Sequence, residues 1–140
     1  MLHISLPQIP KAAEQIAKQL WGGEIFGLVG TLGSGKTTFV KALGKQLKVK
    51  NKITSPTFIL LQGFEAKLPL RGGSALGRKS KKKVILYHLD LYRIKNFTEA
   101  RALGLTEFWG KPETVTLIEW ADRIKKHLPK KTQIIEFSNK

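Results

Sequence analysis

Apolar and polar residues follow each other along the chain with two periods, one typical of helices and one typical of strands. Between residues 8 and 20 the apolar positions recur every three or four residues, which predicts an amphipathic helix that ends at "WGG". The short, largely apolar run "EIFGLVG" at residues 24–30 predicts a strand covered on both faces. After a glycine-rich turn, helical spacing returns through Phe39, Leu43 and Leu47.

The rest of the chain continues this succession of strands and helices. We expect strands at 57–64, 84–92, 114–120 and 132–137, and helices at 97–109, with a break at Gly104, and at 121–128. This rhythm predicts an α/β fold with a central mixed β-sheet flanked by helices. With 140 residues, the chain has the size of one domain, and we predict a single domain over residues 1–140.

Basic residues are concentrated in one segment of a strongly basic chain. Lysine and arginine number 25 against 10 acidic residues, which gives a formal net charge of +15. Residues 65–83, "EAKLPLRGGSALGRKSKKK", hold seven of the basic residues and one acid, and their glycines and lysine run predict a flexible exposed loop. Such charge attracts polyanions, chiefly nucleic acid, although charge that only keeps the chain soluble explains it equally well.

The chain carries no sequence signal for export or for a membrane. It contains no cysteine, and its beginning, "MLHISLPQIP", lacks the basic and apolar regions of a signal peptide. The sequence contains no run of 18 apolar residues, the length needed to cross a bilayer. We therefore expect a cytoplasmic protein with no membrane partner.

The glycine-rich turn "GTLGSGKT" matches the pattern G-x-x-x-x-G-K-[ST] through Gly30, Gly35, Lys36 and Thr37. Glycines allow successive N–H groups to form a nest around phosphate oxygens, and the following helix points its positive end at the same anions. A lysine at this position reaches the β- and γ-phosphates, and the next hydroxyl is a magnesium ligand. Because the motif lies between an apolar strand and an amphipathic helix, it predicts a nucleotide-binding loop.

Two acids lie at the ends of apolar strands, where a magnesium-orienting carboxylate is expected. Asp90 follows "VILYHL", and Glu119 follows "TVTLI". Either acid could hold the metal or orient water, or could be an ordinary acid at a strand end. His88 is interpreted as a hydrogen-bonded core or rim residue rather than a base. The segment "ITSPTF" at residues 53–58 fits either a γ-phosphate sensor or a capped turn.

Taken in order, "GTLGSGKTTF", "TSPTF", "YHLDLYRI", "RALGLTEFW" and "LIEWADR" resemble the motifs of the bacterial TsaE family of P-loop ATPases, which are required for threonylcarbamoyladenosine formation in tRNA. The resemblance extends from about residue 8 to 137, apart from the basic segment 65–83. It implies a P-loop NTPase-like fold that uses ATP and Mg²⁺. The chain also departs from the family pattern at Thr31, where the family usually has an acid, and in its segment 65–83, which is longer and more basic.

The resemblance also implies roles for particular residues and partners. The nucleotide would be bound by Gly33, Ser34, Gly35, Lys36, Thr37 and Thr38. Lys36 and Asp90 would be catalytic, Thr37 and Glu119 would hold the metal, and Trp120 would be their aromatic neighbour. The partners would be a TsaD–TsaB heterodimer, which ATP hydrolysis resets, with tRNA contacted indirectly or through the basic loop. The activity would be an Mg-dependent ATPase that is weak alone and stimulated by its partner.

Two other functions fit the residues. A small P-loop kinase would need an acceptor pocket and an arginine-bearing lid. A basic nucleic-acid-binding module with a regulatory nucleotide site would lose RNA affinity steeply with salt, independently of ATP.

Overall fold

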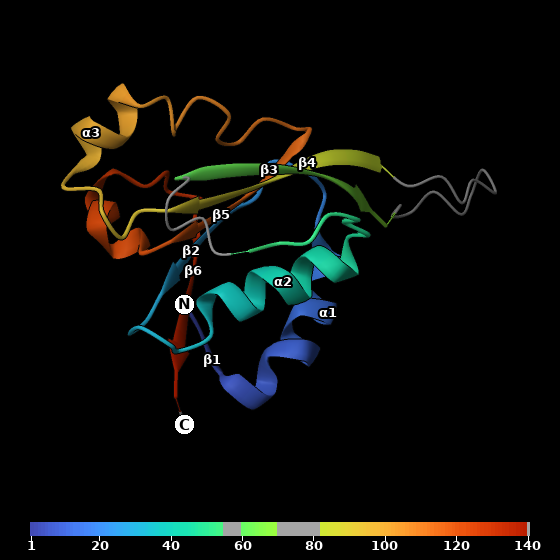
Figure 1. Cartoon of the computed structure of the whole chain (residues 1–140). Helices are drawn as coiled ribbons and strands as arrows, with labels where there is room; N and C mark the ends of the chain where they lie inside the picture. The colour runs from blue at the N-terminus through green and yellow to red at the C-terminus, as the bar shows by residue number, and fades with distance from the viewer. Residues whose placement is uncertain (55–59, 70–81, 140) are drawn as a thin grey trace.

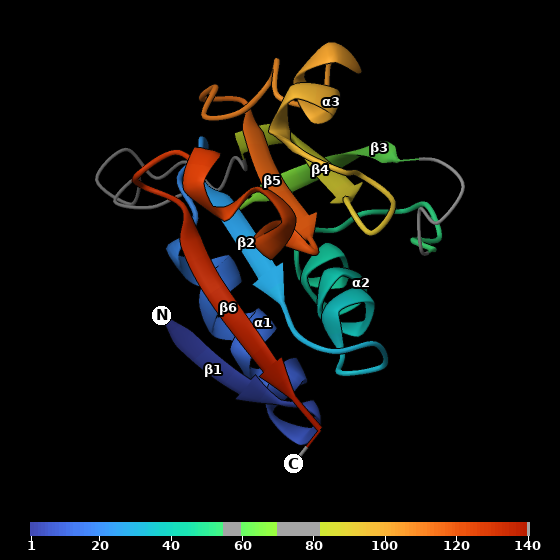
Figure 2. The ribbon, with the colours of Figure 1, turned by 90° about the vertical axis from the view of Figure 1, so that its left-hand side faces the viewer.

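The computed structural model describes residues 1–54, 60–69 and 82–139, and within them six strands form one sheet in the order β1-β6-β2-β5-β4-β3 (Figures 1 and 2). The strands are β1 (Leu2–Ser5), β2 (Ile25–Val29), β3 (Leu61–Leu68), β4 (Lys82–Asp90), β5 (Thr114–Glu119) and β6 (Gln133–Ser138). Neighbouring strands are parallel except β3, which runs antiparallel to β4. The prediction of a mixed sheet is confirmed.

Helices cover both faces of this sheet (Figure 1). One face packs against α1 (Ile9–Gln19) and α2 (Lys36–Gln46), whose apolar residues join the larger hydrophobic core. The other face packs against α3 (Phe97–Ala102) and the 3₁₀ helix η3 (Ala121–His127) around a second core. A further 3₁₀ turn, η1 (Leu6–Gln8), leads into α1. Both faces are covered, which explains why β2 and β5 are apolar along almost their whole length.

The prediction of a loop over residues 65–83 is wrong at both of its ends. Residues 65–68 belong to β3 and residues 82–83 belong to β4, with Leu68 opposite Lys82. The reason is a two-residue period: Phe64, Ala66 and Leu68 are buried, while the charged residues between them are exposed. The expected strand 57–64 is thus found at Leu61–Leu68, and residues 55–59 and 70–81 lie outside the described part of the chain.

Three further differences concern short elements. The expected helix 97–109 ends at Ala102, because Gly104 adopts a left-handed conformation with φ 76° and the chain continues in turns. The expected helix at 121–128 is a 3₁₀ helix with a kink at Ile124. Strand β1 was not expected, and it pairs with β6 at the sheet edge. None of the helices in the described residues is long and apolar enough to span a bilayer.

Candidate functional site

The sheet brings the two strand-end acids and the glycine turn to one edge. Strands β4, β5 and β2 are parallel neighbours, so their carboxyl ends lie together. In the ladder, Asp90 pairs directly with Glu119, and Glu119 pairs with Leu28 near the end of β2. The glycine turn leaves β2 at this point and enters α2, so it lies beside both carboxylates.

The turn needs glycine at the positions that the motif specifies. Gly30, Gly33 and Gly35 have φ values of 151°, 77° and 116°. A Cβ on Gly30 would lie 2.6 Å from Ser34 Oγ, and one on Gly35 would lie 2.7 Å from Ile9 Cδ1. Only glycine combines these torsions with this close packing, and it leaves the N–H groups of the turn at the start of α2, where anions bind.

Lys36 is folded back onto the turn that precedes it. Its Nζ donates to the carbonyl oxygens of Gly30 at 2.6 Å and Thr31 at 2.8 Å, and it lies 4.2 Å from the ring centre of Trp120. Burial lowers the pKa of Lys36, and the nearby acids, Glu119 first, oppose this shift. The lysine therefore holds a cation inside the turn, on acceptors that an incoming phosphate can replace.

Glu119 is fixed by contacts from two directions. The Thr37 hydroxyl donates to its two carboxylate oxygens at 3.0 and 2.9 Å. The Nε2 of His88 lies 2.5 Å from Oε2, and both His88 and Glu119 are buried. The interpretation of His88 as a hydrogen-bonded core residue is confirmed. A carboxylate beside a hydroxyl is a suitable oxygen pair for Mg²⁺.

Asp90 occupies a different environment from its neighbour. It is buried, and its Oδ1 accepts a hydrogen bond from the backbone N–H of Tyr92 at 2.9 Å. Burial raises the pKa of Asp90, and the charge of Glu119 raises it further. The Tyr92 N–H, His88 and Lys36 act in the opposite direction. Of the two acids, Glu119 is the one that contacts Thr37.

These groups line one hollow of about 290 Å³. Its lining consists of Leu32, Gly33, Gly35, Lys36, Thr37, Thr38, Asp90, Tyr92, Glu119 and Trp120. Ser34 is the one predicted binding residue outside this lining, and it is buried beneath the turn. The structure thus brings the expected residues together, while their individual roles stay predictions.

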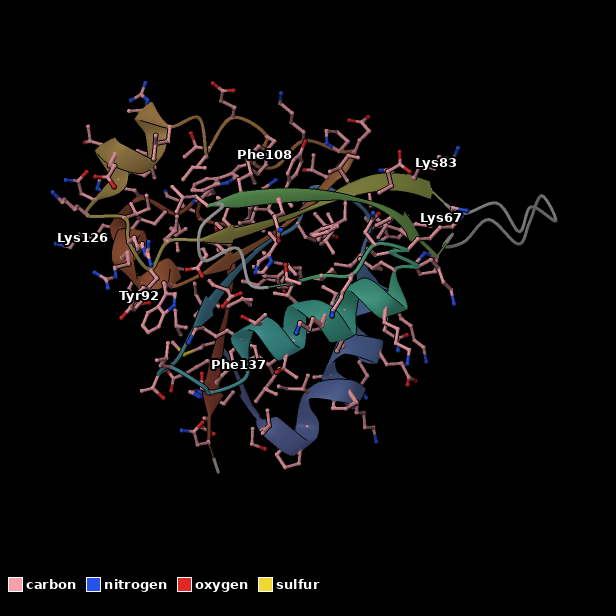
Figure 3. All side chains as sticks on the ribbon, in the orientation of Figure 1. Lys67, Lys83, Tyr92, Phe108, Lys126 and Phe137 are labelled. Atoms are coloured by element: carbon pink, nitrogen blue, oxygen red, sulfur yellow. The ribbon has the colours of Figure 1, made fainter. Side chains whose placement is uncertain are left out.

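Two aromatic residues shape the mouth of the hollow. Trp120 has a left-handed backbone with φ 59°, which is rare for a bulky residue. Its ring centre lies 5.0 Å from that of Tyr92, which Figure 3 labels at this end of the molecule. Tyr92 was not among the predicted site residues, although the two-residue period of β4 continues to it from His88 and Asp90.

The donor set fits a magnesium nucleotide better than a metal bound by protein alone. Among the described residues, no group of three or more His, Cys, Asp or Glu side chains could hold a metal ion. Mg²⁺ commonly takes one or two carboxylates together with substrate phosphates and water. Thr37 and Glu119 provide this kind of partial shell beside the phosphate-type turn. The predicted sensor segment "TSPTF" falls largely on residues 55–58, outside the described residues.

Comparison with known proteins gives one consistent family. Residues 5–140 match the family model "Threonylcarbamoyl adenosine biosynthesis protein TsaE". One relative named "tRNA threonylcarbamoyladenosine biosynthesis protein TsaE", from Aquifex aeolicus, is 42% identical over 82% of this chain and 71% of its own length. Another with the same name, from Synechocystis, is 37% identical over 79% of this chain and 62% of its own length. The Bacillus subtilis relative is 34% identical over 76% of this chain and 56% of its own length.

A solved structure agrees with the sequence comparisons. The crystal structure of Bacillus subtilis YdiB superimposes with a TM-score of 0.59 at 26% identity, covering 90% of this chain and 66% of that one. The arrangement of a mixed sheet flanked by helices, with the glycine turn between β2 and α2, is therefore a P-loop-like fold.

Proposed function

Since the chain belongs to the TsaE family of threonylcarbamoyl adenosine biosynthesis proteins, we propose that it binds and hydrolyses ATP as an accessory protein in the formation of threonylcarbamoyladenosine in tRNA. One observation carries the ATPase part of this proposal. A single hollow holds the lysine and threonine of the glycine turn beside two carboxylates from adjacent parallel strands.

The turn and Lys36 bind the phosphates. The backbone N–H groups at the start of α2 face the anion, and Lys36 exchanges its two carbonyl acceptors for phosphate oxygens. Bonds from an ammonium to charged oxygens are stronger than those to neutral carbonyls, so this exchange favours binding. Lys36 then stabilises charge that develops on the γ-phosphate during transfer.

Thr37 and Glu119 hold the magnesium ion in this proposal. The ion, when bound, neutralises charge on the phosphate oxygens. The role of His88 is to fix the orientation of Glu119 from inside the sheet, through its contact with Oε2.

Asp90 faces the attacking water in this proposal. The water oxygen forms a bond to the γ-phosphorus while the bond to the bridging oxygen of ADP breaks, and the water proton leaves to the phosphate or to solvent. An aspartate whose pKa is raised by burial is a stronger hydrogen-bond acceptor than an ordinary surface aspartate, so Asp90 is suited to orient this water.

The isolated chain is expected to hydrolyse ATP slowly. No arginine lines the hollow among the residues that the structure describes, and we propose that a partner supplies a further positive charge beside that of Lys36 for fast turnover. The proposed partner is the TsaD–TsaB heterodimer, and hydrolysis resets that complex for another round. The exposed Leu32 and Tyr92 at the mouth of the hollow are suited to contact such a partner.

The test is release of inorganic phosphate from ATP by the chain, with and without TsaD–TsaB. We expect strong stimulation by the partner, lost in Lys36→Ala and Glu119→Ala and retained in Lys126→Ala, a matched change away from the hollow. Transfer of the phosphate to a metabolite would favour a kinase instead. Absence of both hydrolysis and partner binding would refute the proposal.

A further inference from the structure

Seven lysines gather at the end of the molecule that does not hold the nucleotide site. These lysines border two adjoining hollows that share Lys48 and Lys50, and we call the seven lysines the lysine patch. Its members are Lys41, Lys45, Lys48, Lys50, Lys52, Lys67 and Lys83. The acids bordering the same hollows are Glu65 and Glu113, so the bordering residues carry a clear positive excess.

The ammonium groups of the lysine patch are available to a ligand. All seven side chains are exposed. Within the described residues none of them has an ion pair or donates a hydrogen bond, whereas Lys36 and Lys82 donate to backbone carbonyls. The patch is therefore not a set of cations neutralised by the fold.

The fold holds like charges together in this patch. Lys67 and Lys83 are directly opposite each other in the β3–β4 ladder. Like charges in this position destabilise a sheet, so their pairing favours an anion that binds between them. The backbone N–H of Lys67 also donates to the carbonyl of Leu47 at 2.8 Å, which attaches β3 to the end of α2 and unites the two halves of the patch.

The patch and the nucleotide site lie at opposite ends of α2. This helix begins at Lys36 in the site and ends at Gln46 beside the patch. Its length corresponds to about 16 Å at ~1.5 Å per residue. Figure 3 shows Lys67 and Lys83 at one end of the molecule and Tyr92 and Lys126 at the other. The patch and the nucleotide hollow therefore share no lining residue, and a phosphate bound at the patch does not occupy the hollow.

We propose that the lysine patch binds the phosphate backbone of RNA, with tRNA as the RNA class because the proposed function concerns tRNA. Lysine ammonium groups bind phosphates as point charges without reading sequence. A lipid surface fits less well, since membrane-binding faces combine lysines with exposed apolar residues. The exposed large apolar side chains among the described residues are Met1, Leu2, Leu6, Trp21, Leu32, Tyr92 and Leu103, and none borders the two hollows of the patch.

The test compares two variants of equal charge by fluorescence titration with a tRNA transcript over a range of salt. The patch variant is Lys48→Gln, Lys50→Gln, Lys67→Gln. The control is Lys95→Gln, Lys126→Gln, Lys130→Gln, three exposed lysines outside the patch. Each lowers the formal charge from +15 to +12, that is 15 − 3. All six positions are exposed, so both variants should fold, which circular dichroism verifies.

We expect the patch variant to lose tRNA affinity about tenfold or more at ~50 mM salt. The slope of the logarithm of the binding constant against the logarithm of the salt concentration should be shallower by roughly two to three. The control should stay within about twofold of the parent. Equal weakening of both variants, or no binding by the parent chain, would overturn the proposal. Binding to vesicles containing anionic lipid that tRNA does not displace would overturn RNA as the occupant.

ATP titrations on the same proteins separate this proposal from the proposed function. The patch variant should bind and hydrolyse ATP like the parent, and Lys36→Ala should keep the affinity and salt slope of the parent for tRNA. If the parent chain hydrolyses ATP no faster than Lys36→Ala while the patch still binds tRNA, only the proposed function fails. If the patch variant binds tRNA normally while hydrolysis behaves as expected, only the patch proposal fails.

Discussion

Replacing His88 tests whether the imidazole stabilises the buried carboxylate of Glu119. In the structure His88 is fully buried, and its Nε2 contacts Glu119 Oε2. His88→Leu fills a similar volume but removes the donor, leaving Thr37 as the donor to Glu119 from the described residues. His88→Gln can return an N–H donor close to the position of Nε2.

The expected loss follows from the kind of hydrogen bond. A hydrogen bond to a charged group contributes about 1.5–3 kcal/mol, and removing one partner of a buried pair costs at least that much. We expect His88→Leu to lower the free energy of unfolding by about 2 kcal/mol. With ~2.1 cal/mol/K of unfolding entropy per residue, this corresponds to a fall in Tm of about 7 °C. His88→Gln should recover at least half of that loss.

Urea unfolding of the nucleotide-free chain measures this effect, and Thr116→Val is the control. Thr116 is fully buried on β5, the strand that carries Glu119, but its hydroxyl has no hydrogen-bond partner among the described residues. Its replacement by valine should be neutral or stabilising, because it removes an unsatisfied polar group.

A second readout is the affinity for Mn²⁺ in the presence of ATP, measured by electron paramagnetic resonance. We expect it to fall in His88→Leu by about 10–100-fold, as is common for residues that orient a ligand, and to recover in His88→Gln. If the leucine and glutamine variants lose stability and metal affinity equally, the hydrogen bond is not the cause and the reasoning is refuted.

Three further predictions concern the nucleotide hollow. Burial raises the pKa of Asp90, so the folded state binds its proton more tightly, and stability should fall as pH rises from about 4 through the raised value. Asp90→Asn should remove this fall, as urea unfolding across pH would show; an unchanged pH profile would contradict it. Lys36→Met should abolish ATP binding in calorimetry yet change the free energy of unfolding by less than about 1 kcal/mol. The variant loses the hydrogen bonds of the ammonium, which destabilises the fold, but it also removes the cost of burying a charge, the same cost that lowers the pKa of Lys36. Gly35→Ala should lower the free energy of unfolding by about 2 kcal/mol, since the added Cβ meets Ile9. Gly33→Ala, whose Cβ has no atom within 4 Å, should lower it by about 1 kcal/mol through torsional strain alone. Equal losses of stability in the two variants would contradict this packing argument.

Local motifs were sufficient to predict the glycine turn, while pairings between distant strands were not. The turn and the start of α2 follow from the spacing of Gly30, Gly35, Lys36 and Thr37, because backbone torsions and the contact of Lys36 with the carbonyls of Gly30 and Thr31 are local in sequence. The contact between His88 and Glu119 depends on β4 lying next to β5, a neighbour relation that no local pattern contains. For the same reason the residues alone left open which acid lies beside the threonine.

In the basic segment, a high density of charged residues led to the prediction of a loop where two strand ends are found. Lys67 and Lys83 suggested a solvated loop, but each alternates with apolar residues that face the core, such as Ala66 and Val84. Counting charge over a window averages the two faces of a strand, whereas the two-residue period separates them. Strand β1 was missed because it is a short edge strand of four residues, and its exposed Leu2 and His3 give little apolar signal.

If the hollow binds a nucleotide as proposed, its geometry indicates which side chain would have to change its contacts. Thr37 gives its single proton to Glu119, so its oxygen lone pairs stay available, and the carboxylate also keeps free lone pairs. These two groups can therefore receive a cation without reorientation, and His88 keeps Glu119 in place. Lys36 is different, because its ammonium donates to the carbonyl oxygens of the turn itself, and in the proposed complex it would exchange them for phosphate oxygens. Among the described residues of the hollow, Thr37 and Glu119 are thus already placed for the proposed cation, and Lys36 is the side chain whose hydrogen bonds the proposed binding of a nucleotide would change.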